Sequence, residues 1–435
     1  MSDNVKKVDG LHMHLENKII SRNFFWMLWI MYAVVYMTKN CYSAAMASIV
    51  HEGALTKTQT GFITAAFYLV YAPLQILGGI YADKYKPENM IKIGLVGGGI
   101  ANLIIFFNQN YYVMLFAWIF NACLSRQSCY TVGFRYGVRC WPAIFKIISS
   151  QLESEYRVKG VYFITFSSTF GLVLAYLVAA VVTNWLYNFL LSAVALFLFA
   201  LIFHIVNKRV ERHMIPDDNV KTTDKRKKRE HVGPKISTWK LFWCSGFVLM
   251  VVITVLRYII SNSVQTLSST MLVESYTKVS PGLGNVLNTL IIISGIIGVM
   301  LVNWIIYPRL IRNEVLATMA LIIFSILPVG AMLFLGKTSV AVMVIALCIG
   351  TAALTGTSLI MSHFSATFGK YGKNGLAAGI YNSAAAFAIV IQNYGVLALA
   401  DHKGWDAVIW LWIGMLVVCV LLALIAYPLR KRFRY

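Results

Sequence analysis

Runs of about twenty apolar residues recur along almost the whole of this 435-residue chain. A helix needs about twenty residues to cross roughly 30 Å of hydrocarbon, and it satisfies its own backbone hydrogen bonds as it does so. The composition agrees, because 59% of the residues are hydrophobic and only 13% are charged, whereas about 25% are charged in soluble domains. We therefore predict an all-α membrane protein.

Breaks that contain charged residues, Gly or Pro divide the apolar runs into about twelve predicted spans. They cover residues 24–47, 59–82, 90–108, 111–131, 160–182, 185–206, 239–262, 283–306, 314–335, 339–361, 375–398 and 406–427. The longest polar stretch includes the basic run Lys225 to Arg229 and separates six spans from six. We expect an N-terminal six-helix bundle over 1–206, a cytoplasmic basic linker over 207–237 and a C-terminal six-helix bundle over 238–435.

The formal net charge of +21 is distributed unevenly over the two faces of this topology. One face carries both termini, the basic linker and the turns after the even-numbered spans, whereas the opposite face collects only Lys57, Lys278, Lys337 and Lys403. Lys and Arg concentrate in cytoplasmic loops, so both termini are predicted to be cytoplasmic. We interpret the basicity as topology and expect a lipid bilayer as partner, no nucleic acid, and a monomer. The short loops favour a bacterial inner membrane.

A signature follows the second span. The segment Gly79-Ile-Tyr-Ala-Asp83-Lys84 resembles the G-x-x-x-D-[RK] motif of the major facilitator superfamily, and the six-plus-six layout with a basic central linker is similar to that superfamily's. The resemblance implies two six-helix bundles that rock about a central site and move a small solute. It also implies that Gly79, Asp83 and Lys84 gate the cytoplasmic side. The matching turn after the eighth span lacks the Gly and the Asp.

Shorter motifs are similar to those of the organophosphate:phosphate antiporters, the glycerol-3-phosphate and hexose-phosphate transporters. In the first span, Tyr36-Met-Thr38-Lys39-Asn40 resembles that family's Y-x-x-R-K-N stretch. In the seventh, Leu256-Arg257-Tyr258 resembles its L-R-Y stretch, and Gly404-Trp405-Asp406 resembles its G-W-D ending. The resemblance implies an anionic organic solute, a sugar phosphate or a related compound.

The departures from this family pattern are informative. The family holds the substrate phosphate with one arginine from each half, because a guanidinium fits phosphate oxygens with two parallel hydrogen bonds. Arg257 matches one of these arginines, but Thr38 stands in place of the other and leaves Lys39 as the nearest cation. The family's histidine in the fifth span falls at about Ser168. A different or less highly charged substrate is therefore plausible.

Charge at membrane depth indicates Lys39 and Arg257 independently of the family resemblance. A charged side chain there is costly and usually faces a water-filled cavity or a partner. Lys39 and Arg257 lie within predicted spans at roughly matched positions of the two halves, and no Asp or Glu lies in the middle of a predicted span. An anionic substrate would supply the countercharge. The alternative is that these cations reach an interface or bond to backbone carbonyls.

Aromatic and amide side chains on the presumed inner faces would add specificity. The predicted substrate-binding residues are Arg257, Lys39, Asn40, Tyr36, Thr38, Tyr258, Ser168 and Asn382. Further residues of the same kind are Tyr68, Tyr71, Gln75, Asn262, Gln265, Tyr381, Gln392 and Asn393. The segment 126–139 adds Arg135 and Arg139, which would share one helix face and either line a pathway or extend a cytoplasmic helix end.

The leading functional hypothesis is secondary or facilitative transport of a small, anionic organic solute by alternating access. The alternative is a transporter-like sensor that binds a solute and signals to a membrane partner without moving it. The sequence has no metal-ligand spacing, no nucleophile–His–acid pattern and no phosphate-binding loop. We therefore expect no enzyme activity, no cofactor and no metal.

Overall fold

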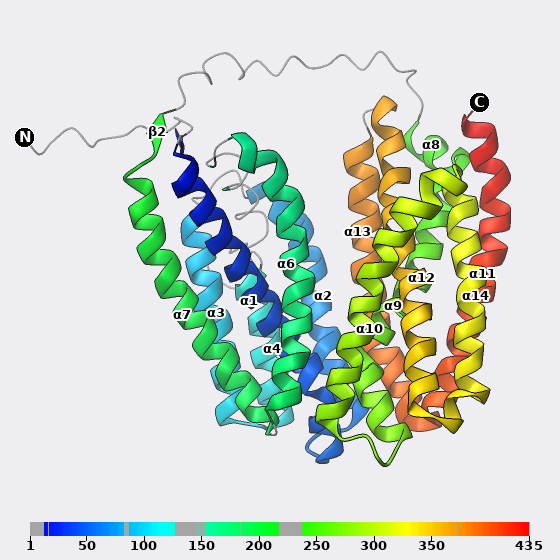
Figure 1. Ribbon diagram of the computed structural model, residues 1–435, viewed down its shortest axis with the longest axis horizontal. Coiled ribbons are helices and arrows are strands. Elements are labelled where there is room, and N and C mark those ends of the chain that lie inside the picture. The colour runs from blue at the N-terminus through cyan, green and yellow to red at the C-terminus, as the bar shows by residue number, and fades with distance from the viewer. Residues whose placement is uncertain are drawn as a thin grey trace, which may run out of the picture.

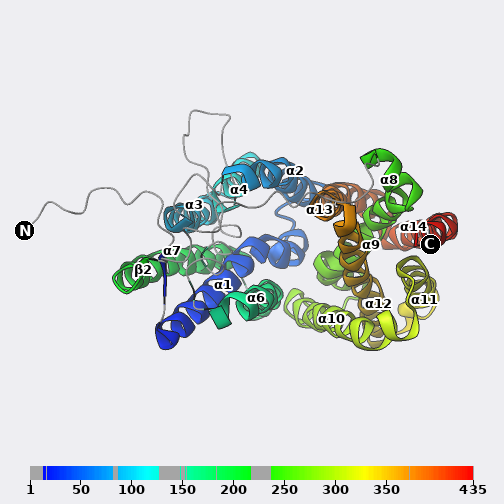
Figure 2. The same ribbon diagram turned by 90° about the horizontal axis from the view of Figure 1, so that it is seen from above.

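The computed structural model describes residues 13–15, 17–81, 87–126, 147, 152, 154–182, 184–216, 237–371 and 373–434. Figures 1 and 2 show two helical bundles side by side, one formed by helices α1 to α7 and the other by helices α8 to α14. We refer to them as the N-terminal half and the C-terminal half. The predicted all-α membrane fold is confirmed.

The N-terminal half follows the predicted order of spans. Its helices are α1 (Lys18–His51), α2 (Lys57–Tyr81), α3 (Pro87–Phe107), α4 (Tyr111–Arg126), α6 (Ser154–Val181) and α7 (Trp185–Glu211). Two short strands, β1 (Met13–His14) and β2 (Ile215–Pro216), pair antiparallel with Met13 opposite Pro216. The predicted linker lies largely outside the described residues, as does most of the segment 126–139.

The C-terminal half contains more irregular helix than the first. Its elements are α8 (Thr238–Cys244), α9 (Phe247–Ser275), α10 (Pro281–Leu301), η2 (Val302–Leu310), α11 (Glu314–Phe334), η3 (Gly336–Thr338), α12 (Val340–Ala366), η4 (Thr367–Tyr371), α13 (Asn374–Ile391), η5 (Gln392–Val396) and α14 (Leu397–Arg434). Of these, η2 and η5 are π-helical and η3 and η4 are 3₁₀-helical.

Asparagine side chains fix the start of three long helices. The side-chain oxygen of Asn17 accepts hydrogen bonds from two amides in the first turn of α1, and Asn313 does the same for α11. Asn184 accepts from the amide of Leu186 at the start of α7. These bonds satisfy backbone donors that have no partner inside the helix, a need that is acute where water is scarce.

One predicted span starts at the wrong place. The apolar run predicted a helix over 239–262, but the structure ends α8 at Cys244 and begins α9 at Phe247. Gly246, which separates them, has φ of 75°, a left-handed conformation that side chains with a Cβ rarely adopt. Hydropathy does not register this turn, because the residues on both sides of it are apolar.

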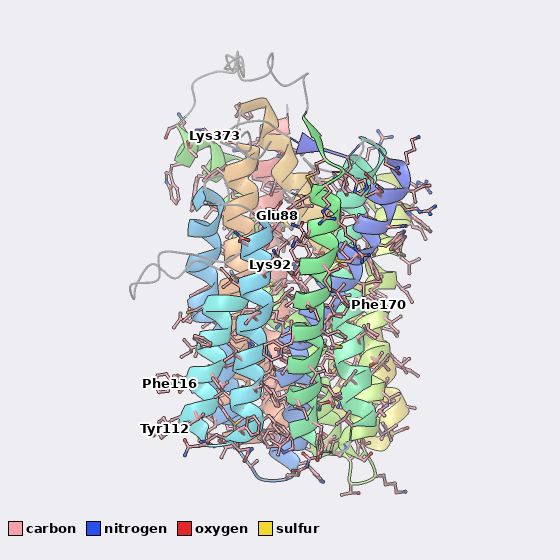
Figure 3. The ribbon with its side chains drawn as sticks, turned by 90° about the vertical axis from the view of Figure 1, so that its left-hand side faces the viewer. Glu88, Lys92, Tyr112, Phe116, Phe170 and Lys373 are labelled. Carbon is pink, nitrogen blue, oxygen red and sulfur yellow. The ribbon has the colours of Figure 1, made fainter. Side chains whose placement is uncertain are left out.

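The outer surfaces of the bundles are apolar. Within the described residues, seven helices are long and apolar enough to cross a membrane, and shorter apolar helices cover Ile91–Phe107, Tyr111–Cys123 and Phe166–Val181. Figure 3 shows the side chains of Tyr112 and Phe116 on the outside of α4, where each is about two-thirds exposed. Hydrocarbon, and not water, is the solvent that such a surface fits.

The two halves meet along a limited set of helices. In the N-terminal half these are α1, α2 and α6, and in the C-terminal half they are α9, α10, α13 and α14. Pairing of α6 with α10 and of α2 with α13 forms the two sides of this interface. Most of the helices that line the space between the halves therefore come from this set.

A buried ion pair holds one end of the C-terminal half together. Arg430, near the end of α14, bonds the carboxylate of Glu314 at the start of α11 with N–O distances of 3.3 Å, and both side chains are 1% exposed. The guanidinium also lies 4.2 Å from the ring centroid of Phe364 and donates to Thr367. Arg430 is therefore a buried structural residue of the C-terminal half.

We predict that Arg430→Met destabilises the protein by about 3–5 kcal/mol, because it removes the positive charge that Arg430 places beside the buried carboxylate of Glu314. The midpoint of thermal denaturation in detergent measures the loss. Arg432→Met, at an exposed position two residues further on, is the matched control and should change little. The double variant Glu314→Gln with Arg430→Met should lose less stability than Arg430→Met alone. Equal midpoints for Arg430→Met and Arg432→Met would contradict this role.

Candidate functional site

A cavity of about 700 Å³ lies between the two halves. Helices α1, α2 and α6 supply one wall and helices α9, α10, α12 and α13 supply the other. The lining residues are Tyr36, Lys39, Asn40, Tyr68, Phe166, Ser168, Thr169, Leu172, Tyr258, Asn262, Gln265, Thr266, Ile292, Gly295, Ile296, Val299, Thr355, Asn382, Ala385, Ala386 and Ile389. The volume is in the range of small-molecule binding sites.

Lys39 is the cationic side chain among the described residues that line this cavity. Its ammonium lies over two tyrosine rings, 5.3 Å from the centroid of Tyr36 and 4.9 Å from that of Tyr68. The negative face of an aromatic ring attracts a cation, so the two rings hold the ammonium in place and offset part of its desolvation. Tyr36 and Lys39 are three residues apart on α1 and therefore share one helix face.

Hydrogen-bonding side chains form much of the opposite wall. The Asn262 amide donates to the Gln392 side chain at 2.6 Å, and the Gln265 amide donates to the Thr355 hydroxyl at 3.2 Å. The Thr266 hydroxyl donates to the Asn262 carbonyl at 2.8 Å. These bonds fix the orientation of the side chains that form the wall. Each amide group has further donors and acceptors that can bind a solute.

Arg257 lies behind this wall. It is 1% exposed, its guanidinium donates to the carbonyl of Leu354 at 2.9 Å and to the hydroxyl of Tyr381 at 3.2 Å, and it lies 5.6 Å from the ring centroid of Tyr258. The structure thus shows the carbonyl bonding that was the alternative interpretation of this residue. Its Nε has no hydrogen-bond partner, and Arg257 is in none of the ion pairs found within the described residues.

The structure brings six of the eight predicted binding residues to the cavity. These are Tyr36, Lys39, Asn40, Ser168, Tyr258 and Asn382. Arg257 does not line it in this conformation, and Thr38 is buried with its hydroxyl donating to the carbonyl of Val35 at 3.0 Å. A substrate contact for any of the eight stays a prediction.

Other lining residues were not in the predicted binding set. Tyr68, Asn262 and Gln265 carried a signal, because they are aromatic or amide side chains on presumed inner faces. Phe166, Thr266 and Thr355 carried no sequence signal beyond their position in a span. Phenylalanine is common throughout apolar spans, and a threonine hydroxyl within a helix usually bonds its own backbone.

The predicted gate can be placed only in part. Gly79 lies within α2, near the end of the helix at Tyr81. Asp83 and Lys84 fall in 82–86, outside the residues that the structure describes. Their gating role stays a prediction.

A set of polar contacts joins the two halves at one end of the interface, and we call it the latch: Lys57, Thr58, Glu274, Asp401 and Trp405. The Lys57 ammonium lies 3.1 Å from the carboxylate of Glu274, which also accepts the indole N–H of Trp405 at 2.6 Å. The Thr58 hydroxyl donates to Asp401 at 2.6 Å. Lys57 and Thr58 begin α2, whereas the other three residues belong to α9 and α14.

Close backbone approach accompanies the latch. A side chain at Gly61, one turn into α2, would collide with the carbonyl oxygen of Asn393 in η5. Figure 1 shows the two bundles approaching each other at this end and diverging toward the end that carries β2, α8 and the C-terminus. The two halves are therefore in close contact at the latch end.

One protein family matches most of the chain. Residues 28–392 match the family described as Major Facilitator Superfamily. The fold resembles that of the nucleoside transporter NupG, with a TM-score of 0.70 and 14% identity over 93% of this chain and 100% of that one. It also resembles a D-xylose–proton symporter, with a TM-score of 0.66 and 14% identity over 94% of this chain and 98% of that one.

Curated relatives match over shorter stretches. The chain is 28% identical over 101 residues to the membrane sensor protein UhpC of Escherichia coli, covering 23% of each protein. It is 29% identical over 93 residues to a probable hexose phosphate transport protein of Chlamydia pneumoniae, covering 21% of this chain and 20% of the relative. It is 35% identical over 75 residues to the probable sulfoacetate transporter SauU of Cupriavidus necator, covering 17% of each. The matches thus span less than a quarter of these relatives.

We predict that Lys57→Glu opens the latch end of the cavity, because two carboxylates then face each other where an ion pair stood. A cysteine introduced at the cavity position Ala385 reports the change: a membrane-impermeant maleimide added from the latch side should label it several-fold faster, with the labelled site identified by mass spectrometry. The swap Lys57→Glu with Glu274→Lys should slow labelling again. Lys278→Glu, at an exposed residue on the same end, is the control. Unchanged labelling in Lys57→Glu would show that the latch does not close the cavity.

Proposed function

We propose that this chain, which belongs to the Major Facilitator Superfamily, is a transporter of a small organic anion. The anion, a sugar phosphate or a related compound, passes through the central cavity by alternating access. One observation carries the proposal: the cavity between the halves contains a lysine held by two tyrosine rings, and no Asp or Glu is among the described residues that line it. A site of this kind attracts anions and repels cations.

The size of the electrostatic term supports an anion. At an effective dielectric constant of about 20, two unit charges about 4 Å apart attract by roughly 4 kcal/mol. A neutral sugar would forgo that attraction. The Arg257 guanidinium, buried behind Tyr258, adds positive potential to the same cavity.

The polar wall of the C-terminal half supports a hydroxylated solute. Asn262, Gln265 and Thr355 present amide and hydroxyl groups opposite Lys39. A sugar phosphate would place its charged group near Lys39 and its hydroxyl groups along this wall. The names of two relatives, one a probable hexose phosphate carrier and the other a probable sulfoacetate carrier, also specify organic anions.

The latch supports alternating access. We propose that the linker end of the molecule is cytoplasmic, as the distribution of lysine and arginine predicts. In the conformation described here the two halves then converge at the outer end and diverge toward the cytoplasmic end (Figure 1). Release of the latch, together with closure of the opposite end, would expose the cavity to the outside. The sensor hypothesis requires binding without flux, and the similarity to solved transporters does not favour it.

Lys39→Gln should reduce uptake of hexose 6-phosphate into proteoliposomes at least tenfold, because the amide keeps the approximate size of the side chain and removes its charge. Lys39→Arg should retain part of the activity. Lys278→Gln removes an exposed lysine far from the cavity and is the matched control. Wild-type uptake by Lys39→Gln would remove this residue from the site.

Arg257→Met should lower uptake as well, because it removes a buried positive charge while keeping much of the side-chain volume. We expect a smaller loss of substrate affinity than in Lys39→Gln, since the guanidinium does not line the cavity in this conformation. Equilibrium binding of hexose 6-phosphate to the purified variant separates affinity from flux. A larger loss of affinity than in Lys39→Gln would show that Arg257 contacts the anion directly.

A further inference from the structure

A second cavity, of about 370 Å³, lies at the latch end of the C-terminal half. Its lining residues come from α9, α11, η3, α12 and α14, and it shares none of them with the central cavity. Met271, Met332 and Met343 are buried and line its interior with Ile409. We call it the methionine pocket. The proposed transport route does not pass through this pocket.

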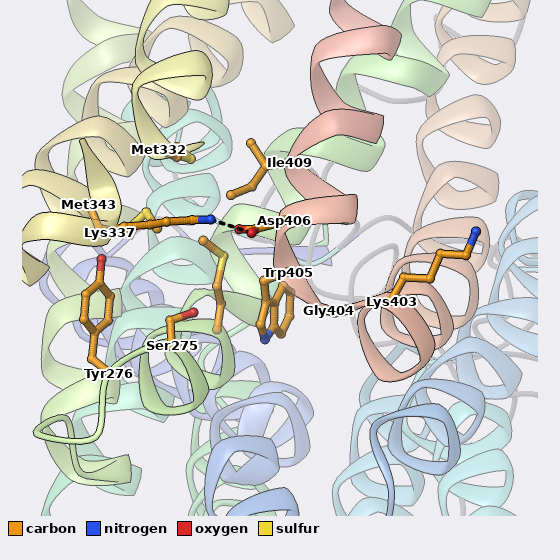
Figure 4. Close-up of a pocket in the computed structure, with 11 residues that line it drawn as sticks. Ser275, Tyr276, Met332, Lys337, Met343, Lys403, Gly404, Trp405, Asp406 and Ile409 are labelled. Atoms are coloured by element: carbon orange, nitrogen blue, oxygen red, sulfur yellow. Dashed lines mark hydrogen bonds and ion pairs between the residues drawn. The ribbon is translucent and has the colours of Figure 1, made fainter. Parts of the chain in front are cut away.

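An ion pair spans the mouth of the methionine pocket. The Lys337 ammonium lies 2.6 Å from the Asp406 carboxylate, and the two side chains are 60% and 57% exposed. Figure 4 shows this pair beside the thioethers, with the Trp405 ring next to it and the Lys403 side chain directed away from the other lining residues. The pocket therefore combines an apolar interior with one positive and one negative group at its opening.

The arrangement of these groups specifies a class of ligand. Thioether side chains are polarisable and adjust their shape, which suits an apolar or aromatic body. An exposed ion pair contributes little to stability, so a ligand can separate it at small cost. A ligand with a single charge would satisfy one member of the pair and strip the other of its partner. A zwitterion satisfies both.

We propose that the methionine pocket is a binding site for a small zwitterionic amphiphile. Its carboxylate pairs with Lys337, its ammonium pairs with Asp406, and its apolar body packs against the methionines and Trp405. A hydrophobic α-amino acid has this pattern of groups. The site differs from the central cavity, where an acidic group is absent from the described lining.

The pocket is connected to the latch through Trp405. The indole ring lines the pocket, and the indole N–H donates to Glu274, the carboxylate that pairs with Lys57 of the other half. A ligand that packs against the ring holds Trp405 in the position that supports this ion pair. Binding therefore favours the latched conformation, since a ligand shifts an equilibrium toward the state that it binds more tightly.

The binding test uses the purified full-length protein in lipid nanodiscs, with L-phenylalanine as the probe. L-Phenylalanine should raise the midpoint of thermal denaturation in a saturable manner, because binding to the folded state stabilises it. Phenethylamine and 3-phenylpropionate, which each lack one charge, should require at least tenfold higher concentrations, and glycine should have no effect. Equal potency of either singly charged analogue, or no shift with L-phenylalanine, would overturn the proposal.

Variants at the exposed mouth locate the site without disturbing the core. Lys337→Gln and Asp406→Asn should each weaken L-phenylalanine binding at least tenfold, whereas Lys278→Gln should leave it unchanged. Full affinity in both mouth variants would place the ligand elsewhere.

The coupling to the latch has its own readout. L-Phenylalanine should slow latch-side labelling of a cysteine introduced at Ala385, and Lys57→Gln should abolish that effect although L-phenylalanine still binds, with an affinity lowered only by the lost coupling. Equal slowing with and without Lys57 would refute the coupling. None of these measurements depends on which anion the central cavity carries, so failure of the transport proposal and failure of this one are distinguishable.

Discussion

A cation at membrane depth must find compensation, and neutral groups around the central cavity supply part of it. The ammonium of Lys39 lies over the rings of Tyr36 and Tyr68, and Arg257 bonds a carbonyl and a hydroxyl behind Tyr258. These neutral partners hold the two cations without cancelling their charge. An anionic solute in the central cavity would add to this compensation, because a buried charge is costly unless it is paired.

The two ion pairs differ in burial, and therefore in the cost of breaking them. Arg430 and Glu314 are each 1% exposed and join helices within one half, so breaking that pair would leave a buried charge. Lys57 and Glu274 are 15% and 26% exposed and join the two halves. Water can solvate their charges when they separate. The strong pair therefore maintains a bundle, and the weaker one can open and close during a transport cycle.

Much of the fold followed from apolar run length alone, because backbone hydrogen bonding in hydrocarbon leaves few alternatives to a helix. The start of α9 did not, since Gly246 turns the chain inside an apolar stretch. The cavity wall formed by α1 was predictable from the charge of Lys39 within a span. The position of Arg257 was not, because a sequence indicates that a cation is buried but not which carbonyl or ring it will contact. Glu314 and Arg430 are 116 residues apart, and nothing local signals their pairing.

Comparison of two sugars that differ only in a phosphate group tests the central claim most directly. Equilibrium binding of glucose 6-phosphate and of glucose to the purified protein in nanodiscs isolates the contribution of the anionic group, since both sugars offer similar hydroxyl groups to the polar wall. We predict at least a tenfold preference for the phosphorylated sugar, equivalent to about 1.4 kcal/mol or more. Equal affinities for the two sugars would contradict an anion site at Lys39.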